Sequence, residues 1–246
     1  MSTQLARHNG TVTPSARGPA LVAVPFLKGR GSEPVELLTD EQRQQLLECA
    51  TIREFPARTI VYRAGSPAEC VFVIGEGVVK SYRDLASGRR RIAAFMFPRD
   101  LFGLAEAGHY VNTVQTITPV RVYEIRFDAL TDLFRREPDI ELQFLCKIVH
   151  VLREAQHHAI MIGRRDAVGR FAMLLRLLQK QSVARGHKEI ALPMSRTDIA
   201  NYLGLSPEAV SRASRRLERQ GIVEFVGRGE VRVIDRQRFA ALAAAA

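Results

Sequence analysis

The chain has 246 residues, 46% of them hydrophobic and 25% charged, and carries a formal net charge of +10 at pH 7. This composition is ordinary for a globular chain with a buried core, and the length allows one large or two small domains. No apolar run approaches the ~20 residues that cross a bilayer, so no membrane partner is expected. The early segment ALVAVPFL contains Pro25 and is followed by KGRGSEP, which argues against a secretory signal.

The positive charge is concentrated in the last third of the chain. Residues 164–246 contain sixteen basic and eight acidic residues, whereas residues 1–163 contain twenty and eighteen. A basic C-terminal region attracts phosphate groups, as nucleic-acid binding requires. The only cysteines, Cys49, Cys70 and Cys146, are odd in number and far apart, which predicts neither a disulfide framework nor a zinc site. A cytoplasmic location is therefore expected.

The first half of the chain predicts a leader followed by a β-roll. Residues 1–34 are rich in Gly, Pro, Ser, Thr and Arg without periodicity, and are expected to be disordered. Thr39 and Gln42 have the capping-box spacing that begins a short helix. From Thr51 to about Arg126, short β-rich runs alternate with turns, which is typical of an antiparallel barrel or roll. We therefore expect a β-roll domain over residues 35–137.

A long helical pattern begins at Pro138, ends near Gly163 and has apolar residues on two sides. One seam comprises Leu142, Leu145, Val149, Leu152 and Ala159, and the other comprises Phe144, Ile148, Val151, Ala155 and Ile162. A helix that is apolar on two sides must bury both. One seam can pack on the β-roll and the other on a twin helix, so residues 138–163 are predicted to be the dimerisation helix of a homodimer. A core helix of a single chain is the alternative.

Residues 164–246 are predicted to form a winged helix-turn-helix domain. Asp166 is placed to cap the helix DAVGRFAMLLRLLQKQSV, and two further helices meet at Gly204, where the turn needs a positive φ. Ser206 is the expected N-cap of the second of these helices, and Gly221 its expected left-handed C-terminal residue. The segments IVEFV and EVRVI flank a GRG turn and predict a β-hairpin wing.

The helix that follows Ser206 has an apolar and a polar face. The inward face is Val210, Ala213 and Leu217, and the polar face is Glu208, Ser211, Arg212 and Arg215. Glu208 can accept from a cytosine amino group and Arg212 can donate to guanine O6 and N7, so Glu208, Ser211 and Arg212 are predicted to read bases. An ordinary solvated helix is the alternative. The expected contacts to the DNA backbone are Ser195, Arg196, Thr197, Arg215 and Arg228.

The stretch RTDIANYLGLSPEAVSRASRRLERQGIVE resembles the DNA-reading region of the Crp/Fnr family of bacterial transcription regulators, on its Fnr/FixK side. The stretch RAGSPAECVFVIGEGVVKSYRDLASGRRRIAAFMFPRDLFGLAE resembles the cyclic-nucleotide-binding β-roll of the same family. The resemblance extends from about Leu37 onward. It implies an α+β fold with an N-terminal cyclic-nucleotide-binding-like β-roll, a long dimerisation helix and a C-terminal winged helix-turn-helix. It also implies a homodimer that binds double-stranded DNA at TTGA-type palindromes, works with RNA polymerase and acts in oxygen- or nitrogen-oxide-related gene control.

The residues that serve the well-known inputs of this family are incomplete. Cyclic-nucleotide binders have a Gly-Glu turn and an arginine about a dozen residues later, but here Leu104 follows Gly103. No Arg or Lys occurs between Phe102 and Arg121, so a buried phosphate would be poorly compensated. The iron–sulfur cluster of oxygen-sensing Fnr proteins needs four thiolates, whereas this chain has three cysteines. No cofactor is therefore expected.

An effector-gated sensor is the alternative function. One of His109, His150, His157 and His158 would supply a haem ligand, or a small molecule would occupy the β-roll. A redox version would use Cys146, whose reactivity requires a lowered thiol pKa. The sequence contains no phosphate-cradling P-loop, zinc-ligand motif or nucleophile elbow, so no enzyme is expected.

Overall fold

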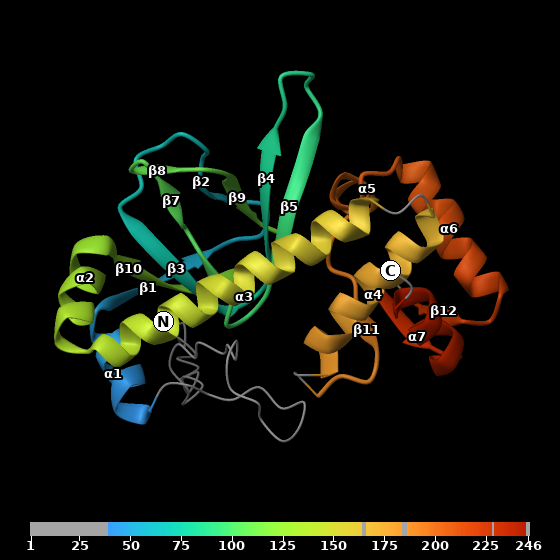
Figure 1. Cartoon of the computed structure of the whole chain (residues 1–246). Coiled ribbons are helices and arrows are strands. Elements are labelled where there is room, and N and C mark those ends of the chain that lie inside the picture. The colour runs from blue at the N-terminus through green and yellow to red at the C-terminus, as the bar shows by residue number, and fades with distance from the viewer. Residues whose placement is uncertain (1–38, 164–165, 184–185, 228, 245–246) are drawn as a thin grey trace, which may run out of the picture.

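The computed structural model describes residues 39–163, 166–183, 186–227 and 229–244. They form a β-roll, a long helix that runs across it, and a smaller, mainly helical domain at the far end of that helix (Figure 1). This is the α+β architecture predicted from the sequence. The predicted disordered leader, residues 1–34, lies outside the described residues.

The β-roll consists of two four-stranded antiparallel sheets, ordered β1-β10-β3-β6 and β2-β9-β4-β5, with a small β7–β8 hairpin. Its strands are β1 Ala50–Phe55, β2 Ile60–Tyr62, β3 Cys70–Glu76, β4 Val79–Asp84, β5 Arg90–Met96, β6 Leu101–Phe102, β7 Ala105–Glu106, β8 His109–Tyr110, β9 Thr113–Thr116 and β10 Val120–Arg126. Helix α1 (Asp40–Glu48) precedes them and begins at the predicted capping box. The Thr39 hydroxyl accepts from the Gln42 N–H at 3.2 Å, and the Gln42 side chain accepts from the Thr39 N–H at 3.0 Å.

Aromatic side chains pack between the two sheets of the roll. Tyr62 stacks on Tyr110 with ring centroids 3.7 Å apart, and Phe72 stacks on Phe102 at 5.0 Å. The two pairs touch, because the centroids of Tyr62 and Phe72 are 5.7 Å apart. Burial raises the pKa of Tyr62, so its phenol stays protonated. The centre of the roll is therefore a neutral, closely packed core.

Two helices follow the roll, α2 (Phe127–Arg136), which the sequence patterns did not predict, and α3 (Pro138–Gly163). Helix α3 crosses the roll and buries Phe144 together with Lys147, whose ammonium pairs with Asp100 at 3.0 Å. The second predicted seam is only partly right, since Ile148 and Ala155 are exposed while Lys147 turns toward the roll. Among the described helices, none is both long and apolar enough to span a membrane.

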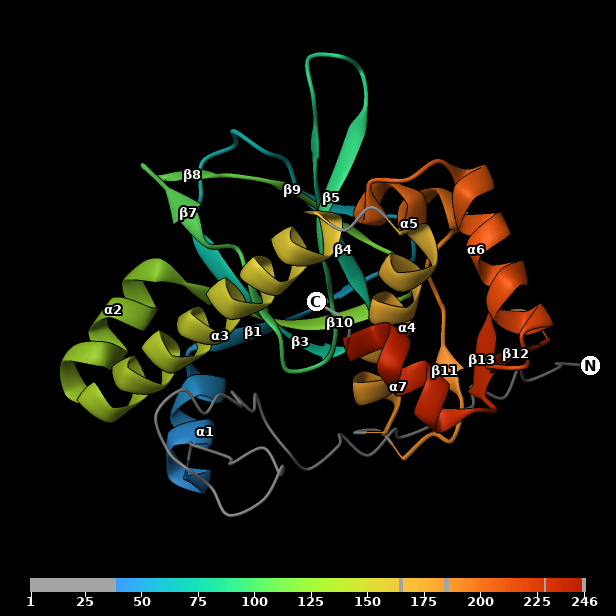
Figure 2. The same ribbon diagram turned by 45° about the vertical axis from the view of Figure 1, so that its right-hand side comes forward.

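The C-terminal domain is built on α4 (Ala167–Val183), whose N-terminus is capped as predicted: the Asp166 carboxylate accepts from the N–H groups of Val168 and Gly169. The other elements are β11 Ile190–Ala191, α5 Arg196–Leu203, α6 Pro207–Arg219, β12 Val223–Val226, β13 Glu230–Val233 and α7 Arg236–Ala244. Strands β12 and β13 form the predicted wing hairpin, and β11 extends it to a sheet ordered β11-β13-β12. Helix α7 lies against α4 (Figure 2). Neither β11 nor α7 was predicted.

Candidate nucleic-acid interface

Helices α5 and α6 form a helix-turn-helix whose turn has the predicted geometry. Gly204 lies at φ 65°, and its N–H donates to the Ala200 carbonyl. Two residues later the Ser206 hydroxyl accepts from the Ala209 N–H at 3.2 Å, which caps α6 directly before Pro207. A left-handed residue followed at once by an N-cap reverses the chain within three residues, and glycine is the residue that adopts this φ without strain.

The C-terminal end of α6 is closed by a Schellman motif. Gly221, at φ 64°, donates its N–H to the Glu218 carbonyl at 2.8 Å, and the Ile222 N–H reaches the Leu217 carbonyl at 3.0 Å. Both ends of α6 are thus held by local hydrogen bonds. Its thirteen residues form a rod about 20 Å long, which is enough to lie across a major groove about 12 Å wide.

The two faces of α6 are those expected from the sequence. Val210, Ala213 and Leu217 are at most 2% exposed, whereas Glu208, Arg212 and Arg215 are exposed. A shallow surface hollow follows the outer side of the helix and is lined by Arg212, Arg215, Glu218 and Arg219. Arg219 was not among the residues predicted from the sequence, although it continues the spacing of three and four residues that begins at Arg212 and Arg215. The outer side of α6 is therefore a cationic strip with carboxylates at two places.

Local hydrogen bonds orient two of the predicted base-reading side chains, Ser211 and Glu208. Nη1 of Arg196, at the start of α5, donates to the Ser211 hydroxyl oxygen at 2.8 Å. Because a guanidinium only donates, the Ser211 proton is left to point to another acceptor. Hydrogen bonding to its own backbone N–H, then to the Ser206 side chain, lowers the pKa of Glu208, which keeps this carboxylate an ionised acceptor.

The predicted backbone-contacting residues lie at the start of α5 and at the wing. Ser195 is the N-cap of α5, accepting from the Asp198 N–H at 3.0 Å and donating to the Asp198 carboxylate at 2.8 Å. Arg196 and Thr197 are exposed beside it. Arg228 lies outside the described residues. The α5 N-terminus and the exposed side of α6 thus hold Ser195, Arg196, Thr197 and Arg215 on the same domain as the predicted base readers.

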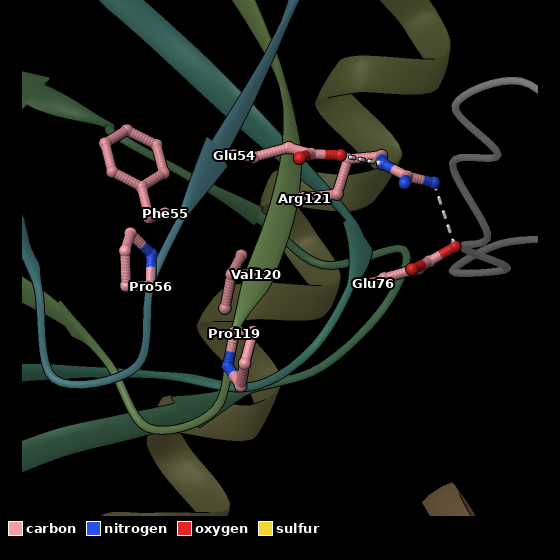
Figure 3. A pocket seen from close by; sticks show the side chains of 7 residues that line it. All are labelled: Glu54, Phe55, Pro56, Glu76, Pro119, Val120 and Arg121. Atoms are coloured by element: carbon pink, nitrogen blue, oxygen red, sulfur yellow. Dashed lines mark hydrogen bonds and ion pairs between the residues drawn. The ribbon is translucent and has the colours of Figure 1, made fainter. Parts of the chain in front are cut away.

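A second surface hollow lies on the β-roll and is lined by Glu54, Phe55, Pro56, Glu76, Pro119, Val120 and Arg121 (Figure 3). The Arg121 guanidinium pairs with Glu54 at 2.9 Å and with Glu76 at 3.1 Å. Arg121 is the first cationic residue after Phe102 in the sequence, and two carboxylates already hold it. A phosphate at this hollow would meet more negative than positive charge, so the hollow is unsuited to a nucleotide.

The side chains considered as sensor groups occupy separate places. Burial raises the pKa of the Cys70 thiol to about 11, and Cys146 is buried on α3. His150 is partly buried on α3, where burial and then the Lys147 charge lower its pKa. His158 donates from Nε2 to the Tyr202 carbonyl at 2.8 Å, and so holds α3 against α5. His109 and His157 are exposed, on β8 and α3 respectively.

Comparison with known proteins gives matches over both parts of the chain. Residues 52–137 match the cyclic nucleotide-binding domain family, and residues 169–242 match the Crp-like helix-turn-helix domain family. The transcriptional activatory protein AadR of Rhodopseudomonas palustris is 35% identical over 183 residues, covering 72% of this chain and 75% of AadR. The nitrogen fixation regulation protein FixK of Bradyrhizobium diazoefficiens is 30% identical over 210 residues, covering 81% and 88%. The solved structure of FixK2 from Bradyrhizobium japonicum has a TM-score of 0.74 at 34% identity, covering 80% of this chain and 98% of that one.

Proposed function

This chain belongs to the Crp/Fnr family of transcription regulators, and we propose that it is a homodimer that reads TTGA-type palindromic operators with α6. Members of this family bind DNA through a helix-turn-helix and are not enzymes. The observation that carries the proposal is the combination of a helix capped at both ends with an outward face on which Glu208 and Arg212 are exposed and Ser211 is partly exposed. Direct base readout needs such donors and acceptors on a rigid element, because a mobile side chain loses discrimination to entropy.

Each base-reading residue has a distinct role in this proposal. The ionised Glu208 accepts from a cytosine or adenine amino group, and Arg212 donates to guanine O6 and N7. Ser211 donates its hydroxyl proton, since Arg196 occupies its oxygen. Arg215 and the first residues of α5 contact phosphates and set the register of the helix in the groove.

The homodimer is supported by the open face of α3. Leu142, Leu145, Ile148, Leu152 and Ile160 are between 39% and 57% exposed, and all lie on this single helix. Side chains of this size along one helix face form the seam of a two-stranded coiled coil when a twin helix covers them. A two-fold axis along α3 would place two α6 helices on the two halves of a palindrome.

In this proposal the β-roll supports the dimer, and DNA binding is not controlled by a cyclic nucleotide bound in the roll. Its interior is filled by stacked aromatic rings, and Arg121 is engaged by two carboxylates. A role in oxygen- or nitrogen-oxide-related gene control is supported by relatives named the anaerobic regulatory protein, in Haemophilus influenzae, and the nitrogen fixation regulation protein FixK. RNA polymerase is the proposed further partner, and the cytoplasm the proposed location.

Binding to a TTGA palindrome and to single-base variants of it tests the proposal. Arg212→Ala should lower the preference for guanine at one position in each half-site by about 1–3 kcal/mol per contact. Arg215→Ala is the matched control, because loss of a phosphate contact weakens all sequences alike and reduces the salt dependence. If the wild-type protein bound random and palindromic duplexes equally at moderate salt, the proposed function would be wrong.

A further inference from the structure

Helix α5 has a second face, which is turned away from the reading surface. Arg196 and Thr197 are exposed next to α6, but Asp198 and Tyr202 are largely buried against other parts of the same chain. In both views α5 lies beside β5 and the C-terminal end of α3 (Figures 1 and 2). The helix-turn-helix is therefore docked on the β-roll through α5.

An ion pair joins the two domains at this contact. The Lys80 ammonium on β4 lies 2.6 Å from the Asp198 carboxylate, and the two side chains are only 12% and 14% exposed. A pair so shielded from water is screened little by salt. Its geometry matters, because removing either partner leaves the other as a buried, uncompensated charge. The pair therefore favours one placement of α5 on the roll over its alternatives.

Tyr202 forms a second, independent part of the contact. Its ring lies between His158 of α3, with centroids 4.0 Å apart and planes at 7°, and Phe95 of β5, at 4.9 Å. The carbonyls at the C-terminal end of α5 also accept hydrogen bonds. His158 donates to the Tyr202 carbonyl at 2.8 Å, and Arg170 of α4 donates to the Leu203 carbonyl at 2.9 Å. Groups from α3, α4 and the roll thus meet on a single turn of α5.

The contact is continuous with the hydrophobic core. Side chains of the roll share one buried cluster with those of the C-terminal domain, and the roll contributes Val78, Tyr82, Ile92, Phe95 and Phe97. The same cluster contains Ile199 and Leu203 of α5 and Val210 of α6. A closely packed interior has little compressibility, so a shift of one side chain is passed on to its neighbours. The orientation of α6 is therefore coupled to that of the roll.

We propose that Lys80, Asp198 and Tyr202 are positioning residues that clamp α5 to the roll and thereby set the distance between the two reading helices of the dimer. Glu208, Arg212 and Arg215 remain exposed in the docked arrangement, so docking orients the reading surface and does not cover it. A palindrome presents its half-sites about one helical turn, roughly 34 Å, apart, and only a fixed placement of both α6 helices matches that distance. This inference rests on the proposed homodimer.

The test compares operators with different spacing between the half-sites. Lys80→Met removes the charge at similar volume, and Lys180→Met is the matched control, since Lys180 is exposed on α4. Binding is measured to the preferred palindrome, to palindromes lengthened or shortened by one base pair, and to a duplex with a single half-site. Lys80→Met should bind the preferred palindrome about tenfold more weakly and lose much of its discrimination between spacings, with single half-site binding unchanged. Lys180→Met should retain the wild-type spacing preference.

Two further variants separate positioning from a general loss of stability. Asp198→Asn added to Lys80→Met should cost little more, because it removes the charge that was left unpaired. Tyr202→Leu removes the ring that contacts His158 and Phe95 while keeping the ion pair, and should reproduce the loss of discrimination between half-site spacings. If Lys80→Met does not fold, the half-site spacing preference of Tyr202→Leu tests the inference in its place. A folded, dimeric Lys80→Met or Tyr202→Leu protein with wild-type affinity and spacing preference overturns the inference. A wild-type protein that does not select palindromes overturns the proposed function instead.

Discussion

Truncation of Leu152 provides a quantitative test of the dimer face on α3. Leu152 is 57% exposed in the single chain, so slightly more than half of its area remains to be buried by a partner. Full burial of a leucine side chain stabilises by about 1.5–3 kcal/mol, which makes the remaining part worth about 1–1.5 kcal/mol. A two-fold dimer contains this side chain twice. Leu152→Ala is therefore expected to weaken dimerisation by about 2–3 kcal/mol, or about 30- to 150-fold in the dissociation constant.

Sedimentation equilibrium over a range of protein concentrations measures this constant directly. Leu85→Ala is the matched control, since Leu85 is 44% exposed but lies in the turn between β4 and β5 and not on α3. Operator binding by Leu152→Ala should become more steeply dependent on protein concentration, because the monomers must first associate. An unchanged dimer dissociation constant for Leu152→Ala, or an equal loss in Leu85→Ala, would refute the assignment of α3 as the dimer helix.

Three further outcomes follow from local contacts. Ser206→Ala removes the cap of α6 and should lower the free energy of unfolding by about 1 kcal/mol in urea titration, unlike Ser87→Ala in the exposed β4–β5 turn. Arg196→Met should reduce base discrimination as well as affinity, and Ser211→Ala added to it should change discrimination little; additive losses would separate the two residues. Burial lowers the pKa of His158, with the hydrogen bond to Tyr202 partly opposing, so its protonation below the unfolded value of about 6.5 favours the unfolded chain. The melting temperature should therefore fall less between about pH 7.5 and about pH 5.5 in His158→Gln than in the wild type; equal slopes would contradict this.

The helix-turn-helix was predictable because its signals are local. Ser206 and Gly221 act on backbone groups within one helical turn, and Gly204 provides a φ that other residues avoid. The inward and outward faces of α6 follow from its 3.6-residue period. The caps, the turn and the two helix faces each depend on residue type and on spacings of a few residues, which can be read from the sequence directly.

Other elements carried weaker local signals. Helix α7 lies in an alanine-rich tail whose function is packing, with Phe239 and Ala243 buried against α4. Strand β11 has two residues and exists because Ile190 and Ala191 pair with β13. The roll-facing side of α3 differs from the predicted seam because Lys147 is buried there and paired with Asp100. Hydrophobic patterning assigns a charged residue such as Lys147 to the surface, so it did not predict this buried position.

From its residues alone, this chain specifies a reading helix with an outward Glu-Ser-Arg face, a β-rich half and a long helix with more apolar surface than one neighbour can cover. The tertiary structure decided which side of α3 stays open, and it brought Lys80 to Asp198 across 118 residues of sequence. It also placed the Arg196 guanidinium on Ser211, which spacing along a single helix does not encode. Caps and periodicity act between residues a few positions apart, whereas partners from different domains meet only after both have folded and packed against each other.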